Sequence, residues 1–231
     1  MKILVISDIH GNLAALDAVT EKADMIFCLG DIVNYGPYPK ACTERVRALT
    51  NNVVRGNHDN AVGRNMDCGC SVKYKEPSDA GKIFTKTSLP VEEKDFLGNL
   101  PTTLYLELEG KRFLLSHGSP GGDIYKYLRP DVSDKQWESE LMNIAADTVF
   151  VGHTHLPMIR NIHGVTVVNP GSVGRPRDSI PMASYAVWED GRVEIKRVRY
   201  DIEATIKGLQ EVDFPSHLIS VLTKILREGG M

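Results

Sequence analysis

Val53-Val54-Arg55-Gly56-Asn57-His58-Asp59 is the stretch around which the rest of this chain can be arranged. It joins a short apolar run to a glycine, an amide, an imidazole and a carboxylate. Taken alone, the cluster is equally compatible with a tight turn in which Gly56 supplies an unusual backbone angle and Asn57 or Asp59 caps the next helix. Four other clusters of the same chemical type also end apolar runs, and five such coincidences favour a functional site.

The other clusters combine carboxylates or histidines with small residues. They are Asp8-Ile9-His10, Gly30-Asp31, Ser116-His117-Gly118 and Gly152-His153-Thr154-His155. Of the seven histidines in the chain, only His163 and His217 lie outside the five clusters. Any single histidine is readily explained as a hydrogen-bonded core residue. The concentration of histidines in the clusters is harder to explain without a shared role.

Together the clusters offer more ligands than one tetrahedral metal ion needs. The candidate oxygen and nitrogen donors are Asp8, His10, Asp31, Asn57, His117, His153 and His155. If a strand continues through His153 and His155, both imidazoles point to one face. Two metal ions are therefore expected, sharing a carboxylate at a separation of roughly 3.5–4 Å. Imidazoles mixed with carboxylates favour manganese, iron, cobalt, nickel or zinc over magnesium or calcium, and we rank Mn²⁺ first.

Composition limits the class of protein. At 231 residues, with 42% apolar and 25% charged side chains, we expect one globular domain over residues 1–231. The formal charge of -3 argues against an extended nucleic-acid surface. The four cysteines show no CxxC spacing and no secretory segment precedes them, so we expect reduced thiols in the cytoplasm. The apolar run before Asp8 is too short to cross a membrane.

The first quarter of the chain alternates aliphatic runs with amphipathic segments. We expect strands at residues 2–7, 25–29 and 52–55 and helices at 13–22 and 39–49. Two strand–helix crossovers followed by a third strand predict a parallel, right-handed α/β arrangement with the first strand central. Ligand sites in such sheets lie at the carboxyl ends of the strands, where the first three clusters fall.

The remainder of the chain is read as helices followed by a mostly β half. Residues 60–76 have weak periodicity and are expected to form a mobile loop. Cys68-Gly69-Cys70 within it could ligate a metal, but no further cysteines lie nearby, so a thiolate zinc site is not expected. The other expected elements are helices at 77–89, 90–100 and 133–146, a hairpin from 103 to 115, strands at 147–151, 158–162, 165–168, 184–188 and 192–199, and two C-terminal amphipathic helices.

The five clusters, in this order, closely resemble the signature blocks of the calcineurin-like metallophosphoesterases. The motif Asn169-Pro170-Gly171-Ser172-Val173-Gly174-x-Pro176-Arg177 further resembles the compact bacterial and archaeal phosphodiesterase branch of that family. The resemblance implies an α/β fold with two stacked mixed β-sheets flanked by helices, an αββα sandwich.

The resemblance also implies a role for each cluster. One ion would be held by Asp8, His10, Asp31 and His155, and the other by Asp31, Asn57, His117 and His153, with Asp31 bridging. His58 would face the substrate and be oriented by Asp59.

The expected chemistry follows from charge. Two divalent ions, two aspartates and a bridging hydroxide leave roughly +1 in the pocket, which suits a phosphate ester. The metals lower the pKa of bound water towards ~7, so hydroxide attacks phosphorus in line while His58 protonates the leaving group or stabilises the phosphoryl oxygens. Arg175 and Arg177 are candidate substrate-binding residues, although solvated surface charges would explain them equally well.

Three functions compete at this point. A phosphodiesterase ranks first, because Arg55, Arg175 and Arg177 are the only further cations in the motif-bearing loops and a monoester needs more of them. A phosphatase or dinucleoside polyphosphate hydrolase is the alternative. A non-catalytic scaffold, like the retromer coat subunit of this fold, ranks last because His58 and all expected ligands are present. We expect a small phosphate ester or nucleotide as substrate and no membrane partner, and leave a homo-oligomer open.

Overall fold

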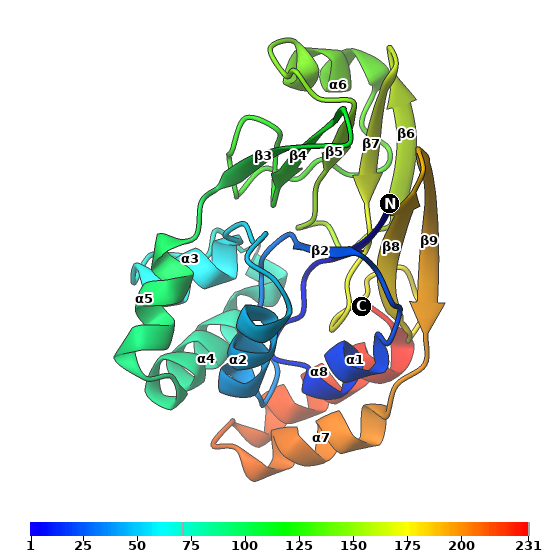
Figure 1. Cartoon of the computed structure of the whole chain (residues 1–231). Coiled ribbons are helices and arrows are strands. Elements are labelled where there is room, and N and C mark those ends of the chain that lie inside the picture. Colours follow the sequence, from blue (N-terminus) through cyan, green and yellow to red (C-terminus); the bar gives the residue numbers. More distant parts are fainter. Residues whose placement is uncertain (71, 231) are drawn as a thin grey trace.

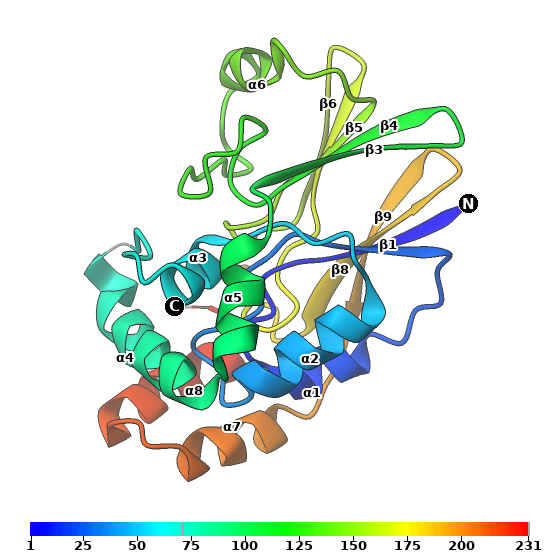
Figure 2. The same cartoon turned by 60° about the vertical axis from the view of Figure 1, so that its left-hand side comes forward.

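Two mixed β-sheets lie face to face in the computed structural model, which describes residues 1–70 and 72–230 (Figure 1, Figure 2). The strand order is β2-β1-β8-β9 in one sheet and β3-β4-β5-β7-β6 in the other. The strands are β1 (Lys2–Ile6), β2 (Met25–Cys28), β3 (Thr103–Leu108), β4 (Lys111–Ser116), β5 (Thr148–Phe150), β6 (Met158–Ile162), β7 (Val165–Asn169), β8 (Ala183–Glu189) and β9 (Arg192–Val198). The β1–β2, β4–β5 and β5–β7 pairs are parallel, and the other pairs are antiparallel.

Helices cover the outer faces of both sheets. They are α1 (Leu13–Ala18), α2 (Pro39–Leu49), α3 (Asn57–Gly63), α4 (Val72–Ser88), α5 (Val91–Asn99), α6 (Asp134–Leu141), α7 (Ile202–Glu211) and α8 (Ser216–Glu228). Figure 2 shows α6 on the five-stranded sheet, on the far side from the other helices. The predicted fold class, two stacked mixed sheets flanked by helices, is confirmed. No helix of the described chain combines the length and apolar character that a bilayer span requires.

The layer between the sheets is built from aromatic side chains. Phe27, Phe113 and Phe150 are fully buried, and Phe27 lies 6.0 Å from each of the other two rings, centroid to centroid. In β1, Ile3 and Val5 face this layer, while Leu4 and Ile6 pack under the helices. Because alternate strand residues point to opposite faces, a strand buried on both sides is apolar throughout. The prediction of a central first strand is confirmed, because β1 lies between β2 and β8.

The predicted strand at residues 52–55 is wrong. Val53 makes only an isolated parallel bridge to Cys28. The chain then leaves the sheet, because the Arg55 N–H donates to the carbonyl of Pro101 and α3 begins at Asn57. The parallel part of this sheet is consequently limited to β1 and β2, and the sheet continues through antiparallel β8 and β9.

Other boundaries also differ from the sequence prediction. The helix predicted at 133–146 is shorter, because α6 spans Asp134–Leu141. The predicted loop at 60–76 is too long, because α3 continues to Gly63 and α4 begins at Val72 with Pro77 inside it. Ser71, which also falls in that predicted loop, lies outside the described residues. The first helix is shorter than predicted and ends at Ala18.

The loop of residues 170–177 packs tightly against the end of β1. The Gly174 N–H donates to the Asp8 carbonyl at 3.1 Å, and the Gly174 carbonyl accepts from the Asn12 amide at 2.9 Å. A Cβ atom at Gly174 would lie 1.8 Å from the carbonyl oxygen of Ile9. Glycine at this position therefore allows two backbone segments, far apart in sequence, to meet beside the clusters.

We predict that Gly174→Ala lowers the free energy of unfolding by about 2–4 kcal/mol, because the backbone must move to accept the methyl group. Urea unfolding measures the difference. Gly121→Ala is the matched control, since a Cβ there meets nothing closer than 4.0 Å. An equal effect of the two substitutions would contradict the close-packing argument.

Candidate metal centre

The seven predicted ligand residues converge on one site from five segments of the chain. Asp8 and His10 follow β1, Asp31 follows β2, and His117 follows β4. The remaining three are Asn57 in the first turn of α3 and the two histidines after β5, His153 and His155. All seven side chains are at most 3% exposed. The carboxyl ends of parallel strands β1 and β2, and of β4 and β5, thus supply most of the site.

One half of the site gathers Asp8, His10, Asp31 and His155. The Nε2 atoms of His10 and His155 lie 3.1 Å apart, and His155 Nε2 lies 3.2 Å from Asp8 Oδ1. His10 Nε2 is 3.9 Å from Asp8 Oδ1 and 3.8 Å from Asp31 Oδ2. Donor atoms of Asp8, His10 and His155 all lie within 4.8 Å of one another, and His10 links this group to Asp31.

The other half gathers Asp31, Asn57, His117 and His153. His117 Nε2 lies 3.0 Å from Asn57 Oδ1 and 3.3 Å from Asp31 Oδ2. Donor atoms of Asp31, His117 and His153 all lie within 4.8 Å of one another. Asp31 Oδ2 therefore faces histidines of both halves, which is the position that a bridging carboxylate requires.

Backbone contacts fix the tautomers of three histidines. The Nδ1 atoms of His10, His117 and His155 face the carbonyl oxygens of Val33, Leu29 and Arg175 at 3.2, 2.7 and 2.5 Å. A neutral imidazole has one N–H group, and a carbonyl can only accept, so that proton must lie on Nδ1. In the neutral ring, each Nε2 then directs a lone pair into the site, as in histidines that bind metals.

Two further atoms of the site have no partner within the described chain. Asp8 Oδ1 and His153 Nε2 are buried and form no hydrogen bond. Unpaired buried polar atoms are costly unless a cation or donor satisfies them. Inward lone pairs, buried carboxylates and these orphaned atoms together make the donor set fit divalent transition-metal ions.

The protonation of the histidines is uneven. Burial lowers the pKa of His153 to about 3 and of His155 to about 4, and it holds the pKa of His10 well below its ordinary value. Burial also acts against a proton on His117, but the Asp31 carboxylate outweighs it and raises the pKa of His117 to about 9. Conversely, burial opposes the charge of Asp31, yet His117 keeps the pKa of Asp31 well below its usual range.

The backbone of the site is strained. Asp8, His10, Asp31, His153 and His155 all have positive φ, between 52° and 65°. Non-glycine residues in this region cost of order 1–2 kcal/mol each, and such residues cluster at functional sites. β5 ends at Phe150, so His153 and His155 do not share a strand face. The left-handed turns aim both imidazoles into the site instead.

His58 has the opposite tautomer. The Asn34 Nδ2 atom lies 2.6 Å from His58 Nδ1, while Asn34 Oδ1 accepts the Tyr35 N–H at 2.7 Å. The amide orientation is thereby fixed, so His58 Nδ1 must accept and the ring proton lies on Nε2. His58 Nε2 faces Asp31 Oδ2 at 4.0 Å, at the edge of the donor cluster. Burial lowers the pKa of His58 to about 4, which keeps the ring neutral.

The structure corrects the expectation that Asp59 orients His58. The Asp59 carboxylate accepts backbone N–H groups of Asp31, Ile32 and Gly56 at 2.7, 2.9 and 3.0 Å. It therefore caps α3 and ties that helix to the loop that carries Asp31. The residue in contact with His58 is Asn34, which the sequence analysis missed. Its only signal in the sequence was its position three residues after Asp31, between the strand expected at 25–29 and the helix expected at 39–49.

Cys68 and Cys70 also reach the site. Cys70 Sγ lies 3.5 Å from His58 Nε2 and 2.6 Å from Cys68 Sγ. The fold thus places His58 as a third donor beside the two cysteines. His58 Nε2 carries a proton, however, and could bind a metal only if that proton moved to Nδ1. The Asn34 amide, which donates to Nδ1, would then have to flip so that its oxygen accepts the proton. All four cysteines of the chain are free thiols.

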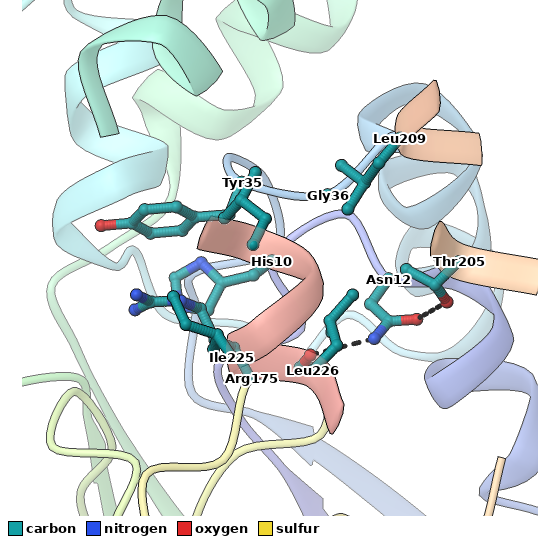
Figure 3. Close-up of a pocket in the computed structure, with 11 residues that line it drawn as sticks. His10, Asn12, Tyr35, Gly36, Arg175, Thr205, Leu209, Ile225 and Leu226 are labelled. Atoms are coloured by element: carbon teal, nitrogen blue, oxygen red, sulfur yellow. Dashed lines mark hydrogen bonds between the residues drawn. The ribbon is translucent and has the colours of Figure 1, made fainter. Parts of the chain in front are cut away.

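The two candidate substrate-binding arginines, Arg175 and Arg177, lie near His58 and the donor residues. The Arg175 guanidinium stacks on Tyr35 at 4.2 Å and on Tyr74 at 4.8 Å, and Arg177 stacks on Tyr74 at 4.6 Å. Figure 3 shows Arg175, Tyr35 and His10 lining one pocket together with α8 side chains. Arg55 points elsewhere, because its Nη1 donates to the Gly98 carbonyl at 2.5 Å.

Comparison with known proteins agrees with the metal-binding geometry of the site. A family model described as a calcineurin-like phosphoesterase superfamily domain matches residues 1–190. An uncharacterised protein from Methanocaldococcus jannaschii is 36% identical, over 94% of this chain and 95% of its own. Phosphodiesterase YfcE from Escherichia coli K12 is 27% identical, over 82% of this chain and 88% of its own.

A solved structure extends the match to the whole fold. The crystal structure of a metallophosphoesterase from Sphaerobacter thermophilus superimposes with a TM-score of 0.81 and 32% identity, over 99% of both chains. The family resemblance inferred from the five clusters is confirmed. The chain belongs to the calcineurin-like phosphoesterase superfamily and is similar to its YfcE-like phosphodiesterase branch.

Proposed function

We propose that this metal-dependent phosphoesterase cleaves phosphodiesters at a centre of two divalent metal ions bridged by Asp31. The observation that carries the proposal is the position of Asp31 Oδ2, 3.8 Å from His10 Nε2 and 3.3 Å from His117 Nε2. One ion would be held by Asp8, His10, Asp31 and His155, and the other by Asp31, Asn57, His117 and His153. Manganese is the proposed ion, and nickel, cobalt, iron or zinc would suit the same donors.

The bound ions would supply Lewis acidity and hydroxide near neutral pH. The surrounding residues prepare the site for them. Carbonyl groups hold the imidazoles of His10, His117 and His155 so that no rotation is needed when an ion or substrate arrives. Burial excludes bulk water, which strengthens every charge interaction with a phosphoryl group.

His58 is the proposed general acid. Its Nε2–H lies at the edge of the donor cluster, and Asn34 holds that proton in place by donating to Nδ1. The low pKa keeps the ring neutral, and the Nε2–H that remains would donate a hydrogen bond to the charge that develops on a departing alkoxide. Asn34 would then orient His58, and Asp59 would hold the loop that carries Asp31 in place.

The diester preference rests on the small number of extra cations. A monoester carries nearly two negative charges at neutral pH and a diester one, so a monoesterase gains more from cations beyond the metals. Arg55 turns away from the site, which leaves Arg175 and Arg177. A phosphatase or dinucleoside polyphosphate hydrolase using the same ions is the second candidate, favoured by the two arginines if the substrate carries further phosphates.

Substrate pairs with a common leaving group test the proposed class. We predict that kcat/KM for bis-nitrophenyl phosphate exceeds that for nitrophenyl phosphate in the manganese-loaded protein. A clear preference for the monoester would put the phosphatase first. Hydrolysis of neither, with both ions bound, would reject both ester classes.

Metal binding at pH 7–8 should release about one proton per chain from His117, in addition to any proton lost by metal-bound water. In the metal-free protein the pKa of His117 is about 9, so His117 is charged at neutral pH and must lose that proton to bind an ion. The pKa values of His153 and His155, about 3 and about 4, leave them nothing to release. Affinity should therefore rise roughly tenfold per pH unit from 7 towards 9.

Calorimetry in two buffers with different ionisation enthalpies counts the released protons. His117→Asn should lower the release by about one proton per chain. Binding without proton release, or an affinity that no longer rises above pH 7, would show that His117 is neutral before the metal binds.

His58→Ala should lower kcat by roughly 10²–10⁴-fold on a substrate with an alkoxide leaving group and leave the metal content unchanged. The loss should shrink for a nitrophenolate leaving group, which departs without a proton. Steady-state kinetics and elemental analysis measure the two effects. His163→Ala, at an exposed histidine paired with Glu138, is the control. Equal losses on both leaving groups would instead make His58 a stabiliser of phosphoryl oxygens.

A further inference from the structure

Arg175 is a buried cation with no anionic partner among residues 1–70 and 72–230. Arg175 is 3% exposed. Neither its Nε nor its Nη1 forms a hydrogen bond to any described residue. Among the residues that the structure describes, no carboxylate lies within ion-pair distance of the Arg175 guanidinium. Burial lowers its pKa, as expected for a charge removed from water without compensation.

The two tyrosines whose rings contact Arg175 compensate for its burial only in part. Tyr35 and Tyr74 present ring faces to the guanidinium at 4.2 and 4.8 Å. Such cation–π contacts hold the group flat and in place, but they leave its N–H donors unused. The donors can be satisfied by an oxygen-rich group that enters from outside the chain.

Arg177 adds a second charge at the same place. Its guanidinium also stacks on Tyr74, at 4.6 Å, and its buried Nε has no partner among the described residues. Two adjacent guanidinium groups repel each other, so their proximity is favourable when an anion lies between them. Planar donors in pairs match the oxygens of a phosphate.

The position of the pair relative to His58 indicates which part of a substrate it would meet. The Tyr35 ring lies 4.2 Å from the Arg175 guanidinium and 4.9 Å from the His58 ring. The guanidinium and the His58 ring are therefore no more than about 9 Å apart. If His58 donates to the leaving group, the departing arm of the substrate passes towards the arginines.

We propose that Arg175 and Arg177 form a second anion subsite, which binds a phosphate carried by the leaving group. This inference rests on the proposed function and specifies its substrate class: esters or anhydrides whose departing arm is itself phosphorylated, as in an oligonucleotide or a nucleoside polyphosphate. Water adds its oxygen to the phosphorus at the metal centre and the bond to the departing oxygen breaks. The departing oxygen gains the proton that the water loses, and the His58 Nε2–H donates a hydrogen bond to that oxygen as it leaves.

The binding test uses a molecule with two phosphates. In the manganese-loaded protein, thymidine 3′,5′-bisphosphate should bind about tenfold or more tightly than either thymidine monophosphate, because charged hydrogen bonds of this kind are worth at least that factor. Arg175→Met and Arg177→Met should each reduce the ratio towards one. Arg160→Met, at an arginine paired with Asp134 and remote from the clusters, should keep it.

The kinetic test uses thymidylyl-thymidine with and without a phosphate on each terminal hydroxyl. The form with the phosphate on the departing nucleoside should have the highest kcat/KM, and both arginine variants should narrow the difference. Because Arg177 is less buried, its variant serves if Arg175→Met fails to fold.

Equal affinity for mono- and bisphosphate would overturn the subsite, as would a preference that survives in both variants. A bisphosphate preference without cleavage of any dinucleotide would leave the subsite standing and reject the proposed function.

Discussion

The Asp31 carboxylate is the interaction on which the rest of this structure depends. Its Oδ1 accepts the backbone N–H of His58 at 2.8 Å, and its Oδ2 faces histidines of both halves of the site. Its own N–H donates to Asp59, which also caps α3. One side chain therefore joins the loop after β2, the helix that carries Asn57 and the strand ends of the second sheet. Moving Asp31 would disturb both candidate ion positions and His58 together.

The fold maintains this arrangement at the expense of local backbone strain. Five of the seven donor residues have left-handed backbone angles, which few side chains adopt without compensation. The compensation comes from the packed layers on either side: β1 is buried on both faces, and glycines such as Gly174 let the neighbouring loop approach its end. The packed core and the strained loops hold the donor atoms pointing into the site before an ion binds. Such preorganisation is what electrostatic catalysis requires.

The sequence predicted which side chains gather in the site better than it predicted the residues that hold them in position. The seven donor residues could be found because each cluster ends a strongly apolar run, and strand ends meet at one edge of a sheet. Asn34 was missed because an asparagine in a loop has many ordinary uses, and its contact with His58 arises only when two loops fold together. The family resemblance assigned Asp59 to His58, but in the first turn of α3 its side chain points back towards the backbone amides. Residues 52–55 read as a strand, yet the Arg55–Pro101 hydrogen bond draws them out of the sheet.

The central claim is that Asp31 bridges two metal ions between the strand ends of the two sheets. Anomalous diffraction from a crystal grown with manganese tests it most directly. The account predicts two peaks, roughly 3.5–4 Å apart, on either side of the Asp31 carboxylate, and the loss of at least one peak in Asp31→Asn. A single peak at saturating manganese, or two peaks that do not share Asp31, would contradict the account.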